Sequence, residues 1–358
     1  MVIDVDGSWG EGGGQVVRLS VALSALIGKP ITICNIRAKR SPPGLRPQHE
    51  TAVRAVAQMA DAEVEGLSVG STRLSFSPKT SKGGRLFFDA GTAASTSLIL
   101  QSLMPIMAFS KEPVQVELHG GTNNPWAPAI DYLQGALLPT LARMRFRGSI
   151  ELVRRGFYPQ GGGIVRAAVS PVERLNSIVS TEFGEIRGIR GLSYSSRLPS
   201  HIAARMATSA NKTIVKDGFK EASIELESLQ PRDSRCAINS GCGIILFAEL
   251  SSGAIICGDS LGEIGKPAEQ VGYEAAESLC EQLRTGSPVD KHLGDQLIVY
   301  MGLACGLSEV KVSQLTLHTL TCIHVLEEML DVHFKVFGEK DAPATITCEG
   351  IGLKRSMP

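Results

Sequence analysis

The stretch SLILQSLMPIMAFSKEPVQVELH, residues 97–119, contains the unit from which the fold is built. Its first part is apolar at helical spacing, SKEP breaks that pattern, and VQVELH alternates as a strand does. Beyond it lie a loop, GGTNNPWAP, a second helical pattern over residues 129–144, and the strand-like runs SIELV and IVRAAV. The stretch and its continuation predict a unit of two amphipathic helices and a few strands.

The same layout occurs twice more along the chain. The copy from Gln15 to about Pro78 contains VVRLSVALSAL, the break GKP, the strand ITICNIR, the helix QHETAVRAVAQMA and strand-like residues near LSFSP. The third copy contains DQLIVYMGLACG, EVKVSQL, TLTCIHVLEEML, HFKVF and ATITCEG. A single unit would expose one sheet face and two apolar helix stripes. We therefore expect an α+β fold in which three repeated helix-and-sheet units pack into one large domain.

Residues 185–286 interrupt the repeat between its second and third copies. They contain the strand-like runs IRGIRGLSYSS, GIILFAEL and GAIICGD, a helix expected from Ser200, and another after Lys266-Pro267, where proline suits a first helical turn. Insertion at a surface loop is a tolerated way to add a domain. The prediction is a large domain of residues 1–184 and 287–358, with a smaller α/β domain of residues 185–286 inserted before the third unit.

Composition sets the broad class of protein. With 358 residues, 43% of them hydrophobic, the chain can bury two ordinary cores. Basic and acidic residues both number 36, so any site for a polyanion must be local. No uninterrupted apolar stretch is long enough to span a membrane, and the start, MVIDVDGSWGEGGG, lacks the layout of a signal peptide. We expect a cytoplasmic protein without a membrane partner.

The eight cysteines are scattered without a CxxC pair, and several lie in apolar runs. They are interpreted as buried thiols rather than as a disulfide or zinc framework. Cys236 and Cys242 with a distant histidine form the alternative metal set, which their spacing disfavours.

Residues 37–54 are locally basic, with five arginines and lysines, one glutamate and a charge of +4. Their proline-bearing middle, KRSPPGLRPQH, is stiff enough to hold guanidinium groups against phosphate oxygens. A solvated basic loop would have the same composition. Glycine-rich turns at GEGGGQ, HGGTN and QGGG are further candidates for anion contacts, and Glu11 and Arg18 flank the first, which leads into a helix. None matches a Walker P-loop, and glycine is equally common in ordinary turns.

Two of the seven histidines invite comparison. His324 lies in line with Thr321, Glu327, Glu328 and Asp331 on the expected polar face of a helix, which predicts a solvated side chain. His318 lies where a strand ends and the helix begins, a place where a side chain can meet a ligand near positive backbone dipoles. Position alone leaves both a structural and a catalytic role open for His318.

The string RGFYPQGGG, residues 155–163, resembles the signature of the RNA 3′-terminal phosphate cyclases. Further blocks similar to that family follow its order along the chain: EGGGQVVR, IRAKRSPPGLRPQH, LQSLMP, GGTNNPWAP, HLGDQ and the LHT of residues 317–319. The resemblance runs from the first ten residues to near the C-terminus. It implies a large domain of three repeated units with a smaller inserted domain, as the repeat pattern also predicts.

The resemblance also implies an activity, the ATP-dependent, metal-assisted conversion of an RNA 3′-phosphate to a 2′,3′-cyclic phosphate through adenylated enzyme and adenylated RNA. His318 matches the nucleophile of the family. Neutral imidazole is nucleophilic near neutral pH, and its attack on the α-phosphorus of ATP would give a phosphoramidate that passes AMP onward. The neighbouring 2′-hydroxyl would then displace AMP in an intramolecular step.

Other site residues are carried over from the resemblance position by position. The family's ATP-site positions are matched by Gln101, Pro128, His292, Leu293, Gly294, Asp295 and Gln296. Its residues for the terminal RNA phosphate are matched by Arg37, Arg40 and His49, with Arg18 matching a required arginine. Glu11 is the candidate carboxylate for Mg²⁺ or Mn²⁺. The sequence departs from some members at His292 and Gly294, which bears on nucleotide preference.

Two other functions are compatible with parts of the pattern. Ribosome-assembly relatives of the same fold bind RNA without cyclase activity and lack the nucleophilic histidine, whereas this chain has His318 together with Asp295 and Gln296. Enolpyruvyl transferases share repeated helix-and-sheet units, but the HLGDQ and RGFYPQGGG blocks argue against them. The sequence therefore favours the enzyme acting on RNA with a 3′-phosphate end.

Overall fold

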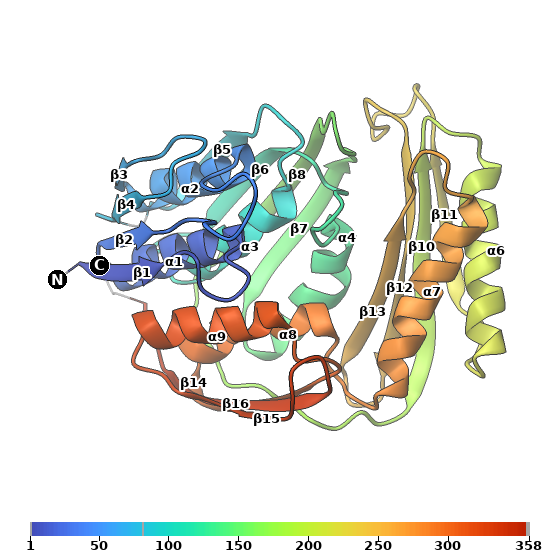
Figure 1. The fold of residues 1–358 in the computed structure, drawn as a ribbon. Coiled ribbons are helices and arrows are strands. Elements are labelled where there is room, and N and C mark those ends of the chain that lie inside the picture. The colour runs from blue at the N-terminus through green and yellow to red at the C-terminus, as the bar shows by residue number, and fades with distance from the viewer. Residues whose placement is uncertain (1, 81, 356–358) are drawn as a thin grey trace.

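A computed structural model describes residues 2–80 and 82–355 and confirms a mixed α+β fold built on several sheets (Figure 1). The first sheet has the order β1-β2-β4-β3, in which β1 and β2 are parallel and the other neighbours antiparallel. Its strands are β1 (Ile3–Asp6), β2 (Ile31–Cys34), β3 (Glu63–Glu65) and β4 (Leu74–Ser77). Its helices are α1 (Gly14–Ile27) and α2 (Pro47–Ala60).

The second sheet has the order β5-β6-β8-β7 and the same alternation of one parallel and two antiparallel pairs. Its strands are β5 (Gly84–Asp89), β6 (Val114–Gly120), β7 (Arg147–Arg154) and β8 (Gly163–Ser170). Its helical segments are α3 (Thr96–Ala108), α4 (Ile130–Tyr132), η1 (Leu133–Leu137) and α5 (Leu138–Arg143). The helix expected over residues 129–144 therefore contains a π turn, which lies just before Pro139, a residue without the N–H that a regular helix uses.

The third sheet has the order β9-β14-β16-β15, again with its first two strands parallel. Its strands are β9 (Val179–Ser180), β14 (Cys305–Val312), β15 (Phe334–Phe337) and β16 (Ala344–Ile351), and its helices are α8 (Lys291–Leu303) and α9 (Leu317–Met329). In all three sheets the strand order is first, second, fourth, third. The opening strands β1, β5 and β9 lie outside the sequence units expected above. β1 and β9 are short, and GRLFFD of β5 does not alternate apolar with polar residues.

The fourth sheet, of order β11-β10-β12-β13, comes between β9 and α8 in the chain and stands at the right of Figure 1 with α6 and α7 on its outer side. Its strands are β10 (Ile186–Ser196), β11 (Ser223–Leu229), β12 (Gly241–Leu250) and β13 (Ile255–Leu261). Its helices are α6 (His201–Lys216), with Ser200 as N-cap, and α7 (Ala268–Arg284), with Pro267 as N-cap. Both begin within one residue of the positions expected from the sequence.

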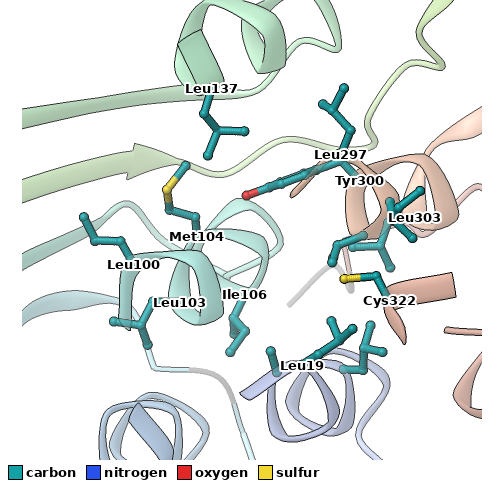
Figure 2. Close-up of a cluster of buried hydrophobic side chains, with 14 of the residues drawn as sticks. Leu19, Leu100, Leu103, Met104, Ile106, Leu137, Leu297, Tyr300, Leu303 and Cys322 are labelled. Atoms are coloured by element: carbon teal, nitrogen blue, oxygen red, sulfur yellow. The ribbon is translucent and has the colours of Figure 1, made fainter. Parts of the chain in front are cut away.

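The hydrophobic side chains form two large clusters. One joins helices and strands of the first three sheets, and Figure 2 shows part of it, where α1, α3, η1, α8 and α9 contribute Leu19, Met104, Leu137, Tyr300 and Cys322. The other lies wholly within residues 189–283, between the fourth sheet and its helices. Residues alternate along β12, so that Ile244 and Leu246 belong to the second cluster and Ile245 and Phe247 to the first. The fourth sheet therefore has one face on its own core and the other on the rest of the molecule.

All eight cysteines are free, as expected. Five are buried, but Cys305 at the start of β14 is exposed, so the expectation of buried thiols is wrong for that residue because the strand begins at the molecular surface. Within the described residues no group of three or more potential metal-ligating side chains occurs, at Cys236 and Cys242 or elsewhere. None of the helices in residues 2–80 and 82–355 has the length and apolar character needed to cross a membrane.

Candidate active site

A cavity of about 650 Å³ lies where α1, α3, α8 and α9 meet the loop before α4 and one edge of the fourth sheet. Seven of the residues singled out in the sequence line it: Arg18, Gln101, Pro128, His292, Asp295, Gln296 and His318. Leu293 and Gly294 do not. Leu293 is buried in the main hydrophobic cluster, and a side chain at Gly294 would meet Val312 of β14 at 3.0 Å, so both positions serve packing.

His318 is in the first turn of α9, whose N-cap is Thr316 with its hydroxyl accepting from the Thr319 N–H. The imidazole Nδ1 lies 3.1 Å from Oε1 of Glu11. A carboxylate can only accept, so Nδ1 is the donor, and in the neutral ring the lone pair is therefore on Nε2. The ring is about half exposed at 48%. His318 is thus presented in the tautomer that a nucleophilic Nε2 requires, at the positive end of a helix where a phosphate is stabilised.

Glu11 also contacts Arg40, whose Nη2 lies 2.9 Å from Oε2. The carboxylate comes from the GEGGGQ turn before α1 and is partly exposed at 31%. Magnesium is commonly held by one or two carboxylates together with substrate phosphates, rather than by an all-protein cage. A single accessible carboxylate beside a candidate nucleophile fits Mg²⁺ or Mn²⁺ bound in that way.

Arg18 and Asp295 line the same cavity as His318. Burial lowers the pKa of Arg18 to about 10, and its guanidinium has no carboxylate within ion-pair distance among the described residues. Burial, reinforced by the charge of Asp290, raises the pKa of Asp295 to about 7. A guanidinium enclosed without a direct counterion is suited to an anionic ligand, because a ligand phosphate restores the neutrality that the protein leaves incomplete.

The basic loop within residues 37–54 is held in place by hydrogen bonds and ion pairs of its own arginines, unlike a freely solvated loop. Arg37 has a left-handed φ of 53° and donates from Nη1 to the carbonyls of Pro42 and Gly44 at 2.8 and 3.1 Å. Arg40 reaches the His318 site through Glu11, whereas the exposed Arg54 pairs with Glu50 along α2. Arg37 and Arg40, both expected at one phosphate site, therefore differ in their contacts. Arg40 lies next to Glu11 and so near His318, whereas Arg37 stabilises the backbone of the loop.

His49 is buried in the first turn of α2, where its Nδ1 accepts a hydrogen bond from the Arg46 N–H at 3.1 Å. Its Nε2 packs so closely on the start of α1 that a Cβ added at Gly14 would lie 1.9 Å away. Burial, with the charges of Arg18, Arg37 and Arg46, lowers the pKa of His49 to about 3. The ring is therefore neutral and protonated on Nε2.

His324 differs from the sequence expectation of a solvated side chain. Its ring stacks on Trp9 with centroids 4.0 Å apart, and its Nε2 lies 3.2 Å from Glu328. Thr321, expected on the same polar face, is buried and donates to the Leu317 carbonyl. The prediction was wrong because the N-terminal turn with Trp9 covers this side of α9.

Sequence reasoning missed Asp290, the N-cap of α8. Its Oδ1 accepts from the hydroxyl of Tyr132 at 2.8 Å and from the N–H groups of His292 and Leu293, and its Oδ2 accepts from the Cys257 N–H at 3.2 Å. One carboxylate thereby joins α4, α8 and β13 around the cavity. The sequence did contain a clue, because an aspartate just before the helix that carries HLGDQ is a preferred N-cap residue.

Arg155, the first residue of RGFYPQGGG, is almost fully buried at 1% exposure. It makes a bidentate pair with Asp131 at 2.8 and 2.9 Å, a 2.7 Å bond to Glu227 of β11, and a stacking contact 3.9 Å over the ring of Tyr194 of β10. The RGFYPQGGG block, which carries the most specific resemblance, therefore connects the second and fourth sheets through Arg155. None of its residues is among the described residues that line the cavity.

The sequence of this chain was compared with those of known proteins. A sequence model of the RNA 3′-terminal phosphate cyclases matches residues 9–336. Relatives named RNA 3′-terminal phosphate cyclase from Pyrobaculum aerophilum and Ignicoccus hospitalis are each 45% identical, covering 99% of this chain and 100% of their own. One of the same name from Caldivirga maquilingensis is 46% identical over 93% of this chain and 94% of its own. With the match extending over nearly every residue that builds the cavity, the chain belongs to the RNA 3′-terminal phosphate cyclase family.

Proposed function

We propose that this protein is a ligase-class enzyme that uses ATP to convert the 3′-terminal phosphate of RNA into a 2′,3′-cyclic phosphate, with His318 as nucleophile. The observation that carries the proposal is the contact between Nδ1 of His318 and Glu11, which leaves Nε2 available beside a cavity containing Arg18 and Asp295. Family membership and the printed names of the relatives support the same activity.

The chemistry proceeds in three displacements. Nε2 of His318 attacks the α-phosphorus of ATP, forming a P–N bond as pyrophosphate leaves. An oxygen of the RNA 3′-phosphate then attacks the same phosphorus, the P–N bond breaks, and His318 is released. Finally the 2′-hydroxyl attacks the RNA phosphorus and AMP leaves, closing the ring in an intramolecular step that needs little further catalysis.

Within this scheme ATP occupies the cavity. Gln101, Pro128, His292, Asp295 and Gln296 line it and contact the nucleotide, while Leu293 and Gly294 position the first turn of α8 from behind. Glu11 would hold Mg²⁺ or Mn²⁺ with the ATP phosphates, and the ion would neutralise charge on the departing pyrophosphate.

The RNA end is held on the side of His318 occupied by the basic loop. Arg40 is placed for direct phosphate contact, since its guanidinium lies next to Glu11. Arg18 faces the transferring phosphorus from the cavity. Arg37 shapes the loop, and the neutral His49 supplies an Nε2–H donor at the start of α1.

The architecture is part of the proposal. The first three sheets share one strand order and are interpreted as repeated units forming a large domain of residues 1–184 and 287–358. Residues 185–286, which have their own hydrophobic cluster, are interpreted as an inserted domain. We also propose a cytoplasmic location, where RNA ends and ATP are available. The non-catalytic ribosome-assembly alternative is disfavoured, because a nucleophile held by Glu11 serves no purpose in RNA binding alone.

The activity is tested with an RNA that carries a labelled 3′-phosphate. Incubation with the protein, ATP and Mg²⁺ or Mn²⁺ should render the label resistant to phosphatase and shift the product to a 2′,3′-cyclic end on chromatography. The same RNA with a terminal 2′-deoxyribose is the matched control, because it lacks the attacking hydroxyl and should stop at the adenylated end. Label that stays phosphatase-sensitive with either metal would contradict the proposed function.

A further inference from the structure

The RGFYPQGGG block lies beside the mouth of the cavity. Its Phe157 forms a parallel β-bridge with Asn123 in the loop before α4. Bridged segments lie about 5 Å apart, and the next residues on the two sides are Tyr158 and Asn124, of which Asn124 lines the cavity. Trp126 also lines the cavity and is 95% exposed, so the cavity opens to solvent at this loop. Tyr158, itself 59% exposed, is therefore an aromatic side chain at the cavity mouth.

The turn that carries Tyr158 is fixed from below. Phe157 is buried, and its ring stacks on Tyr194 of β10 with centroids 6.3 Å apart. The Phe157 carbonyl accepts from the Gly161 N–H at 2.7 Å and from the Asn239 amide at 3.3 Å. A tyrosine on such a support has few conformations to lose when a flat ligand stacks on its ring.

Two arginines adjoin this turn, and each is anchored through one nitrogen. Nε of Arg154 donates to the Gly162 carbonyl at 2.9 Å, and Nε of Arg197 donates to the Ala237 carbonyl at 2.7 Å. Among the described residues no carboxylate pairs with either guanidinium, so the Nη groups are available to a ligand. Ile238 connects the two arginines, because it follows Ala237 and lies 2.4 Å from where a Cβ on Gly162 would be. We call this the rim surface: Arg154, Tyr158, Arg197 and Ile238.

The rim surface is locally basic in a chain without net charge. Residues 154–162 and 230–240 together with Arg197 contain five arginines and one aspartate, and two further carboxylates pair with Arg155, which leaves a net charge of +2. Figure 1 shows the β7–β8 and β11–β12 connections at the same edge of the molecule. Exposed aromatic rings beside unpaired guanidinium groups are suited to single-stranded nucleic acid, because bases stack on the rings and phosphates meet the cations.

We propose that the rim surface binds the RNA strand upstream of its 3′ end, with a base stacked on Tyr158 and phosphates on Arg154 and Arg197. This rests on the proposed function. Only the end of the RNA reaches His318, so the preceding nucleotides pass out of the cavity, and the rim surface adjoins its mouth. Every base has a flat face, so this contact favours longer RNA without favouring a sequence.

The test compares a 3′-phosphorylated dinucleotide, which is too short to span both places, with an RNA of about twelve nucleotides. Tyr158→Ala should lower kcat/KM for cyclisation of the longer RNA about tenfold and leave that of the dinucleotide unchanged. Tyr158→Phe, which keeps the ring, should match the wild type. Tyr273→Ala, which removes an exposed tyrosine of α7 on the outer side of the fourth sheet, is the matched control.

Two further measurements separate the strand from ATP and from catalysis. Covalent capture of AMP without RNA should be unchanged in Tyr158→Ala, and a loss there would assign the ring to ATP and overturn the inference. Fluorescence anisotropy with the longer RNA should show weaker binding by Tyr158→Ala, and a shallower dependence of affinity on salt for Arg197→Gln. Equal losses with both RNAs, or unchanged affinity for the longer one, would also overturn it. Tyr158-dependent binding of RNA that is never cyclised would leave this inference standing and overturn the proposed activity.

Discussion

At the scale of single residues, the proposed chemistry depends on a contact between two side chains near the N-termini of helices that are distant in sequence. Glu11 precedes α1, His318 opens α9, and their side chains lie 3.1 Å apart. The sequence indicates each separately, through a glycine-rich turn and a strand-to-helix junction. It could not indicate their contact, because that contact depends on how α1 packs against α9.

Arg40→Ala should weaken use of the RNA phosphate more than self-adenylation. Arg40 is the loop arginine that reaches the His318 site, through its 2.9 Å pair with Glu11. Loss of one charged contact to phosphate should cost on the order of 2 kcal/mol in kcat/KM for RNA. Arg54→Ala, which removes an exposed arginine paired with Glu50, is the control. If single-turnover rates of both half-reactions fall equally in Arg40→Ala, Arg40 acts on ATP instead.

His49 should make the protein less stable in mild acid. The pKa of His49 is about 3 in the folded protein and 6.5 in the unfolded chain. Below about pH 6.5 the unfolded chain therefore binds a proton at His49 that the folded protein does not bind. The contribution of His49 to stability should fall by about 1.4 kcal/mol per pH unit over that window. Urea unfolding of His49→Gln at successive pH values should show a shallower decline than the wild type. Parallel curves would mean that His49 is free to protonate.

At the scale of elements, sequence patterns predicted the long helices and most strands because those carry clear apolar periods. The strands β1, β5, β9 and β11 were not predicted. β1 and β9 have only four and two residues, GRLFFD of β5 has three consecutive apolar residues instead of an alternation, and SIELESL of β11 is mostly polar. The α9 helix was predicted, but its polar face was misassigned at His324, because the covering Trp9 comes from outside any predicted element.

Arg155→Ala should destabilise the joint between the second and fourth sheets. The substitution leaves the carboxylates of Asp131 and Glu227 with 8% and 13% exposure and without their shared partner. Removing one member of a buried charge network costs about 3–5 kcal/mol. Arg205→Ala, which removes an exposed pair with Glu269, should cost less than about 1 kcal/mol and serves as control. Similar losses for the two variants in denaturant unfolding would contradict a buried joint.

At the scale of the whole molecule, the sequence predicted an interruption of the repeat but not what the interrupting segment does. Its outer helices cover one face of the fourth sheet, and the opposite face packs Ile245 and Phe247 on the main cluster and brings Asp259 to the cavity. The apolar residues of β12 and β13 indicate that both faces of the fourth sheet are buried. They do not indicate which part of the chain packs on the second face. The contribution of this segment to the site becomes apparent only from tertiary packing.

Replacing residues 185–286 by a short Gly/Ser linker should leave the remaining sheets folded but weaken nucleotide binding. The remaining chain keeps most of the main hydrophobic cluster, whereas the cavity loses the wall formed by Asp259, Ser260, Leu261, Glu263 and Lys266. Circular dichroism should show one cooperative transition, and calorimetry should show reduced AMP affinity. Absence of a cooperative transition would contradict the boundaries, and unchanged affinity would contradict the shared cavity.

The central claim, that His318 becomes covalently attached to AMP, is tested most directly by incubating the protein with α-labelled ATP and divalent metal and then denaturing it. The wild type should retain label through an acid-labile, base-stable bond, as expected of a phosphoramidate. His318→Ala should retain none within detection, because a covalent route has no substitute once its nucleophile is removed. His324→Ala, whose ring stacks on Trp9, should still capture AMP. Label that persists on His318→Ala, or that survives mild acid on the wild type, would show that another residue carries the nucleotide.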